Sequence, residues 1–364
     1  MENESKKFQL TGLERSWILY DVGNSAFVLM VATLIPIFFN ALAETGGLSS
    51  VEYLAYWGYA SSVVTIVTAV LSPILGTLAD TKGFKKPIFL LCLIVGVAGC
   101  CMMGFAATWL PFLVIFVVAK VGFSGSLVYY DSMLSDVTTP DRMDEVSARG
   151  YAWGYIGSCV PFVVCLALVL GAGTIGLPQM TALNIALLLT AVWWLGTSLP
   201  LLKQYKQVHY VEVEKHAILQ SFARIGHTLK NLYKDKQVFW FLLAFFCYID
   251  GVYTIIDMAT AYGTALGLDT TGLLLALLLT QIVAFLGVAL RTAVHPVSVQ
   301  HADPGLHRGL RGHCGVCVFP DPAVAVLGAG GHCGNVPRRG AGVEPLPLCQ
   351  DHPAGKVGRI LRPV

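Results

Sequence analysis

The stretch "GTLADTKGFKK", from Gly76 to Lys86, decides how this chain folds. It follows a long apolar run, so it marks the point where a helix ends and a polar loop begins. Its glycines permit close helix approach and a tight turn. Asp80 can accept hydrogen bonds from backbone donors at a helix N-terminus, and the lysines that follow can anchor the loop. We interpret Gly76, Asp80, Gly83, Lys85 and Lys86 as a gating loop between two membrane helices.

The composition of the whole chain favours a polytopic membrane protein. Of its 364 residues, 55% are hydrophobic and only 13% are charged, whereas soluble domains carry about 25% charged residues. The formal net charge of +2 is too small to indicate nucleic-acid binding. The chain contains no nucleotide-binding loop, zinc-protease helix or nucleophile elbow, so we expect neither an enzyme nor a cofactor. The polar N-terminus gives no sign of a cleavable signal peptide.

Eight apolar runs are long enough to cross a membrane, which takes about 20 helical residues. They predict an all-α protein with helices at Trp17–Ala43, Tyr53–Ala79, Pro87–Ala107, Leu110–Tyr130, Ser147–Leu170, Gln179–Leu202, Phe239–Tyr262 and Gly272–Leu290.

The charges of the connecting loops predict the orientation and the domains. Lys and Arg residues precede the first helix and occur in every second connecting loop. The loops between these contain neither Lys nor Arg. Because positive loops stay in the cytoplasm, we expect a cytoplasmic N-terminus in a bacterial inner membrane. We expect a six-helix bundle over 1–202, a cytoplasmic linker with an amphipathic helix over 203–238, and two helices of a second bundle over 239–290.

Several charged residues fall inside the predicted helices, where they are costly unless they face water or a partner. Asp21 and Asn24 are three residues apart in "WILYDVGNSAF", hence on one helical face. Lys120 lies in the middle of the fourth helix, and either Asp21 or an anionic substrate could be its partner. A buried structural hydrogen bond to a neighbouring helix is the alternative for Asp21.

The seventh helix carries a second polar face in "YIDGVYTIID". Asp250, Tyr253 and Asp257 follow one another at spacings of three and four. Asp250 and Asp21 each lie close after a tyrosine, as two repeated halves would give, with both acids near a central cavity. The alternative is that two acids match by chance.

The segments "YDVGNSAF", "GTLAD", "YYDSML", "ARGYAWGYIGS" and "YIDGV" resemble the vacuole effluxer-like family of the major facilitator superfamily, which is related to autophagy-linked amino-acid exporters. The resemblance covers roughly residues 12–285 and implies two six-helix bundles that work by alternating access. It marks Tyr20, Asp21, Asn24, Asp131, Asp250 and Gly251. Asp131, Ser135 and Ile249 depart from the pattern of the family.

The resemblance implies a secondary transporter of small solutes, with proton-coupled amino-acid efflux as the specific expectation. Asp21 or Asp250 would carry the proton, and Tyr20, Asn24 and Tyr253 would contact the substrate. Lys120, Asp131 and Asp257 complete the predicted binding set. The alternative is a membrane-embedded binding or scaffold protein that does not transport.

The amino-acid composition of the chain changes abruptly from Gly287 onward. Nine of the 17 prolines and six of the nine histidines lie beyond it, and no Tyr or Trp does. A frame one base later permits apolar segments typical of the missing helices, so we predict a frameshift near Phe285–Gly287. The tail, 291–364, would then be irregular and the product inactive. The Cys and His residues of "GHCGVC" fit no zinc spacing, so we expect no metal site.

Overall fold

The computed structural model describes residues 8–212, 222–223, 226–227, 230–231 and 236–294. Residues 295–364 of the predicted tail and most of the predicted amphipathic linker helix lie outside these residues, and residues 291–294, which were predicted to be irregular, belong to a helix that ends at Val294. All the regular elements of the described part are helices, joined by loops, with a single isolated bridge between Thr81 and Val211.

All eight predicted spans coincide with helices. Their bounds are α1 Gly12–Ala32, α2 Leu34–Thr45, α3 Ser50–Asp80, α4 Lys85–Met103, α5 Trp109–Val137, α6 Met143–Gly171, α7 Gln179–Gln204, α9 Lys236–Ala265 and α10 Thr270–Val294. Among the described residues, seven segments are long and apolar enough to cross a membrane, and α10 contains a shorter apolar stretch. The chain is an all-α integral membrane protein, as the apolar runs predict.

The first span is interrupted at Thr33, which separates α1 from α2. An interruption leaves backbone carbonyls without their partners within the helix. The Thr260 hydroxyl of α9 donates a hydrogen bond to the carbonyl of Ala32 at this point. The interruption therefore provides a contact between the first helix and the part of the chain that follows the linker.

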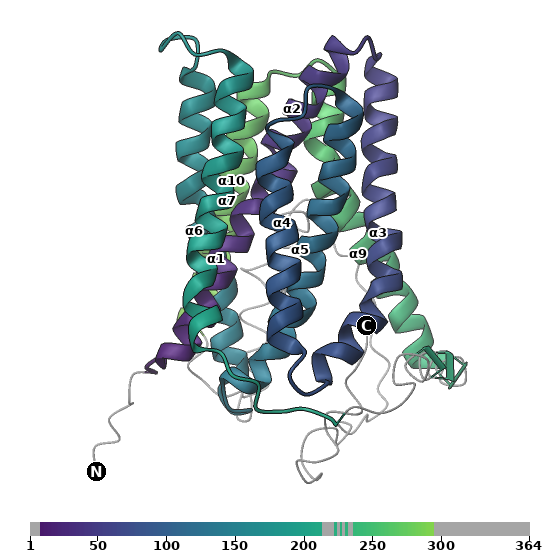
Figure 1. The fold of residues 1–364 in the computed structure, drawn as a ribbon, viewed down its shortest axis with the longest axis vertical. Helices are drawn as coiled ribbons and strands as arrows, with labels where there is room; N and C mark the ends of the chain where they lie inside the picture. Colours follow the sequence, from purple (N-terminus) through teal and green to yellow (C-terminus); the bar gives the residue numbers. More distant parts are fainter. Residues whose placement is uncertain (1–7, 213–221, 224–225, 228–229, 232–235, 295–364) are drawn as a thin grey trace, which may run out of the picture.

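The helices stand side by side in one bundle (Figure 1). In it α1 packs against α6 and α7, while α5 packs against α3 and α4. The helices that follow the linker pack against this group, α9 on α3 and α10 on α6. The core contains stacked aromatic rings, among them Phe27 on Trp194 at 5.1 Å and Trp57 on Phe116 at 4.6 Å. Buried aromatic area of this kind stabilises helix packing.

The close contact of α1 with α6 depends on a face of small residues on α6. A Cβ atom at Gly157 would lie 2.4 Å from Cγ1 of Val22, and one at Gly150 would lie 2.9 Å from the Trp17 indole. These glycines let the two backbones approach each other. Gly150 and Gly157 both lie in "ARGYAWGYIGS", where glycines recur at spacings of four and three, a pattern typical of a helix-packing face.

Candidate functional site

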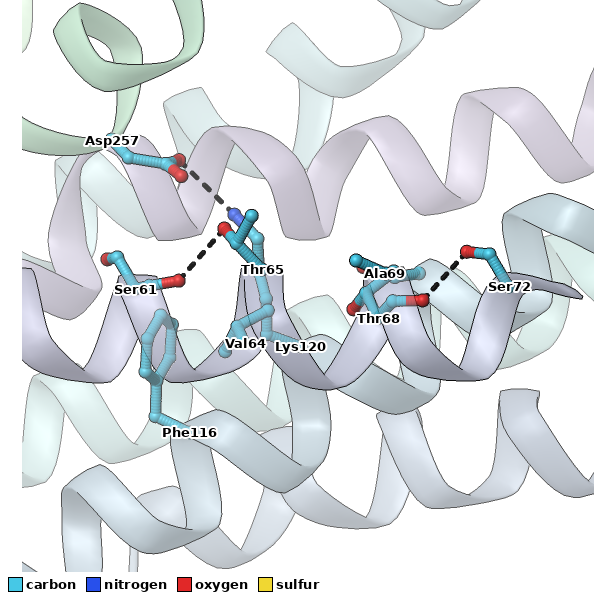
Figure 2. Close-up of a pocket in the computed structure, with 10 residues that line it drawn as sticks. Ser61, Val64, Thr65, Thr68, Ala69, Ser72, Phe116, Lys120 and Asp257 are labelled. Atoms are coloured by element: carbon cyan, nitrogen blue, oxygen red, sulfur yellow. Dashed lines mark hydrogen bonds and ion pairs between the residues drawn. The ribbon is translucent and has the colours of Figure 1, made fainter. Parts of the chain in front are cut away.

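A cavity of about 320 Å³ lies between α3, α5 and α9, at the height of the middle of α3 (Figure 2). Helix α3 supplies one face, on which residues recur at spacings of three and four. The lining residues are Ser61, Val64, Thr65, Thr68, Ala69, Ser72, Phe116, Lys120, Ser124 and Asp257. The volume falls in the range typical of small-molecule sites.

An ion pair crosses this cavity between α5 and α9. The Lys120 Nζ atom lies 3.2 Å from Oδ1 of Asp257, as Figure 2 shows, and the two side chains are 17% and 28% exposed. The Trp57 indole donates to the main-chain carbonyl of Asp257 at 2.9 Å, which fixes α9 against α3 at this level. Because the pair is partly exposed, both charges remain accessible to a solute in the cavity.

The partner of Lys120 is therefore Asp257, and the pairing with Asp21 considered from the sequence is wrong. Helices α1 and α5 run in opposite directions. Asp21 lies nine residues after the start of α1, and Lys120 lies seventeen residues before the end of α5. At a rise of about 1.5 Å per residue, the two side chains differ in depth by roughly 12 Å.

Asp21 and Asn24 share a helical face, as predicted. The Asn24 amide donates to Oδ1 of Asp21 at 3.2 Å. Asp21 is half-buried and faces α6, because a Cβ atom at Gly154 would lie 2.9 Å from its Oδ2. Asp131 is exposed and lies within electrostatic range of Asp21. Two acids of the predicted set thus occupy one region between α1, α5 and α6.

The remaining residues of the predicted binding set lie elsewhere. Tyr20 is fully buried, and its hydroxyl donates to Ser126 Oγ at 2.7 Å. Asp250 and Tyr253 are exposed on α9, one to two turns before Asp257. Lys120 and Asp257 are the members of the set that line the cavity. The substrate or proton roles of the others stay predictions.

The loop from Gly76 to Lys86 is held by its lysines, as its sequence predicts, and its gating role stays a prediction. Gly83 adopts a φ of +79°, in the left-handed region that favours glycine at this turn. Lys85 is buried and lies 3.0 Å from the Asp136 carboxylate at the end of α5. Lys86 donates to the carbonyl of Tyr205 at 3.4 Å, and the Asp80 carbonyl accepts from the backbone amide of the linker at 2.7 Å.

The segment that holds this loop, residues 205–212, was not indicated by any sequence pattern, and we call it the strap. The Gln207 side chain accepts from the Gly83 amide at 2.9 Å and donates to the carbonyls of Thr81 and Ala79 at 3.2 and 3.3 Å. The Val211 backbone pairs with the residues on either side of Thr81. One amide side chain and one short backbone pairing thus fix the loop.

The Asp136 carboxylate joins the loop, α5 and the strap. Besides Lys85, it accepts from the Tyr205 hydroxyl at 2.5 Å and from the His209 backbone amide at 2.7 Å. Burial and the neighbouring carboxylate raise the pKa of the Tyr205 phenol well above its ordinary value, so the hydroxyl remains a donor. Asp136 lies within the segment "YYDSMLSDV". An acidic residue at the end of a helix was the sequence feature from which this contact could have been suspected.

A second contact that the sequence did not indicate joins α1 to the α5–α6 connection. The Arg142 guanidinium donates to both oxygens of Glu14, at 2.9 and 2.8 Å, and Thr138 donates to the same carboxylate at 2.6 Å. Glu14 also forms a capping box with Thr11 at the start of α1. This two-point geometry is the strong form of an Arg–carboxylate pair.

The comparisons with known proteins agree with this architecture. The sequence model of the family described as "Vacuole effluxer Atg22 like" matches residues 13–298. The chain belongs to this family. A relative from Bacillus subtilis (strain 168), the uncharacterized MFS-type transporter YxiO, is 42% identical over 281 residues. The match covers 76% of this chain and 66% of the relative, just under two thirds of its length.

The family match and the apolar helices identify an integral membrane protein of the vacuole effluxer-like family. The predicted family and fold class are confirmed.

Proposed function

We propose that this protein moves a small solute across the membrane by alternating access, and that the cavity between α3, α5 and α9 binds the solute. The observation that carries the proposal is the partly exposed Lys120–Asp257 pair. Charges inside a bilayer are costly and are retained where they bind substrates or ions. This pair also spans the two parts of the chain that would move relative to each other.

The position of the contacts between α9 and the first helices supports alternating access. Asp257, Met258 and Thr260 contact α3 or the end of α1, all in the second half of α9. The first half, from Lys236 to Gly251, is largely exposed. The contacts of α9 with α3 and α1 thus lie towards one end of the bundle, and alternating access would require breaking them.

The two charges fit a zwitterion, so we propose an α-amino acid as the solute. Lys120 would bind its carboxylate and Asp257 its ammonium group, so that the solute would replace the ion pair without leaving either charge unpaired. Following the family, the direction would be efflux from a cell whose inner membrane holds the protein with the N-terminus inside. Tyr20, Asn24 and Tyr253 remain further proposed substrate contacts.

Proton coupling would use an acid outside the ion pair. Asp21 is the first choice, because it is half-buried and lies within electrostatic range of Asp131. A pair of neighbouring carboxylates can hold one proton between them. Asp250 is the second choice.

We also propose that the change in composition after Gly287 is a shift of reading frame and that the 364-residue product does not transport. The family match ends at residue 298, close to the proposed shift. Transport is therefore measured on the protein made from a frame-corrected gene, with the 364-residue chain beside it. Uptake by the 364-residue chain equal to that of the corrected protein would contradict this proposal.

The test of transport is uptake of radiolabelled amino acids into proteoliposomes, with and without a proton gradient. We expect uptake by the corrected protein that the gradient stimulates, and loss of that stimulation in Asp21→Asn. Unchanged proton-driven uptake in Asp21→Asn would remove this residue from the coupling role. If no amino acid enters while the protein binds one, a non-transporting binding protein becomes the better description.

A further inference from the structure

The wall of the cavity formed by α3 carries a stripe of hydroxyl groups. Ser61, Thr65, Thr68 and Ser72 follow one another at spacings of four, three and four, and Ser124 lines the cavity from α5. Figure 2 shows the stripe running along α3 away from the ion pair, with Ser61 and Thr65 beside the charges. A helix face of this kind next to a cavity offers hydrogen bonds to an occupant.

The hydrogen bonds within the stripe leave capacity for a ligand. Thr65 Oγ1 donates to the Ser61 carbonyl at 3.1 Å, and Ser72 Oγ donates to the Thr68 carbonyl at 2.8 Å. Each of these oxygens can still accept a hydrogen bond. The Thr68 hydroxyl is buried and has no hydrogen-bond partner within the described part of the chain. Buried polar groups usually have a hydrogen-bond partner, so this hydroxyl is available to bond to an occupant of the cavity.

The charge of the cavity restricts the occupant further. Among the residues that the structure describes, its lining contains one cation, Lys120, and one anion, Asp257. Both charges are paired with the solute when a zwitterionic head group replaces their ion pair. A charged side chain on the solute would then enter the stripe without an opposite charge, which is unfavourable in a low dielectric. The solute that fits the cavity therefore has a neutral side chain, whose methylene groups would pack against Val64, Ala69 or Phe116.

We propose that the hydroxyl stripe on α3 is a side-chain subsite that selects neutral amino acids with a hydrogen-bonding side chain, such as an amide, over aliphatic ones of equal length. This inference rests on the proposed zwitterion site. From Thr65 to Ser72 the stripe is roughly 10 Å long, at about 1.5 Å per residue. That length holds the side chain of glutamine with its amide near Thr68. An aliphatic chain leaves the hydroxyls unpaired, and sites that hydrogen-bond their substrates reject such analogues strongly.

The test is binding to the purified, detergent-solubilised 364-residue chain and to the frame-corrected protein. Isothermal titration compares L-glutamine with L-norleucine, which has a side chain of similar length, and with L-glutamate. We expect glutamine to bind at least tenfold more tightly than either. Thr68→Val should reduce the preference for glutamine over norleucine at least fivefold, while norleucine binds as before. Thr77→Val, a matched change on α3 outside the cavity lining, should leave the preference unchanged.

The outcomes separate the two proposals. Equal binding of norleucine and glutamine, or an equal loss of both in Thr68→Val, overturns the subsite and leaves the zwitterion site standing. If none of the three amino acids binds to protein that is monodisperse and helical by circular dichroism, both proposals fail. Lys120→Met should weaken glutamine and norleucine alike, because both share the head group.

Discussion

Asp136 should be more important for stability than its lysine partner. The Lys85–Asp136 pair has both side chains essentially buried, at 3.0 Å. At an effective dielectric constant of about 20 its Coulomb energy is about 5.5 kcal/mol. Breaking a buried pair by removing one partner costs roughly 3–5 kcal/mol. The two single variants should fall at different ends of this range, because they leave different groups unpaired.

In Lys85→Met the carboxylate keeps the donors of Tyr205 and His209, so we expect a loss of about 3 kcal/mol in the free energy of unfolding. In Asp136→Asn the buried ammonium loses its only charged partner and keeps uncharged acceptors, the Ser132 carbonyl and the amide oxygen of the new side chain, so we expect a loss of about 4–5 kcal/mol. The double variant should lose at least about 2 kcal/mol less than the sum, because neither charge is then left alone.

The assay is unfolding of the purified chain in mixed dodecylmaltoside and SDS micelles, followed by circular dichroism. Lys82→Met provides the control, because its ion pair with Glu212 is exposed and should contribute nothing measurable. Additive losses in the double variant, or an Asp136→Asn protein as stable as the wild type, would refute the reasoning about this carboxylate.

Two further predictions concern glycine and the strap. Gly157→Ala should destabilise the bundle by about 1–3 kcal/mol, because its Cβ atom would lie 2.4 Å from the Val22 side chain. The control, Gly196→Ala, places its Cβ atom in open space and should leave the stability unchanged. Equal melting temperatures of the two variants would contradict this prediction. Gln207→Ala should speed hydrogen exchange of the Gly83 amide at least tenfold, because that amide loses its acceptor. Unchanged exchange at Gly83, measured by mass spectrometry, would show that the strap does not hold the loop.

The helices could be predicted from the sequence because their cause is local. A run of about 20 apolar residues must hydrogen-bond its own backbone in a bilayer, whichever helices surround it. The packing face at Gly150 and Gly157 could be predicted in the same way, because close helix packing needs small residues at regular spacing. The anchoring of the loop by Lys85 also followed from its sequence.

The pairings between helices could not be predicted in the same way. Lys120 and Asp257 are 137 residues apart, and their meeting depends on how α9 packs against α3 and α5. Helical spacing gives the face of a residue but not its neighbour across the bundle. The strap was missed for a related reason. Gln207 acts through three main-chain groups, and such contacts leave no residue pattern.

The most direct test of the account is whether the Lys120–Asp257 pair binds the solute. The measurement is uptake of L-glutamine into proteoliposomes containing the frame-corrected protein, compared with Lys120→Met and Asp257→Asn. A lost charge-assisted hydrogen bond is worth about 1.5–3 kcal/mol, so we predict a loss of roughly 10- to 150-fold in each variant. Lys203→Met, an exposed lysine at the end of α7, should transport normally. Uptake by both pair variants at the rate of the Lys203→Met protein would contradict the central claim.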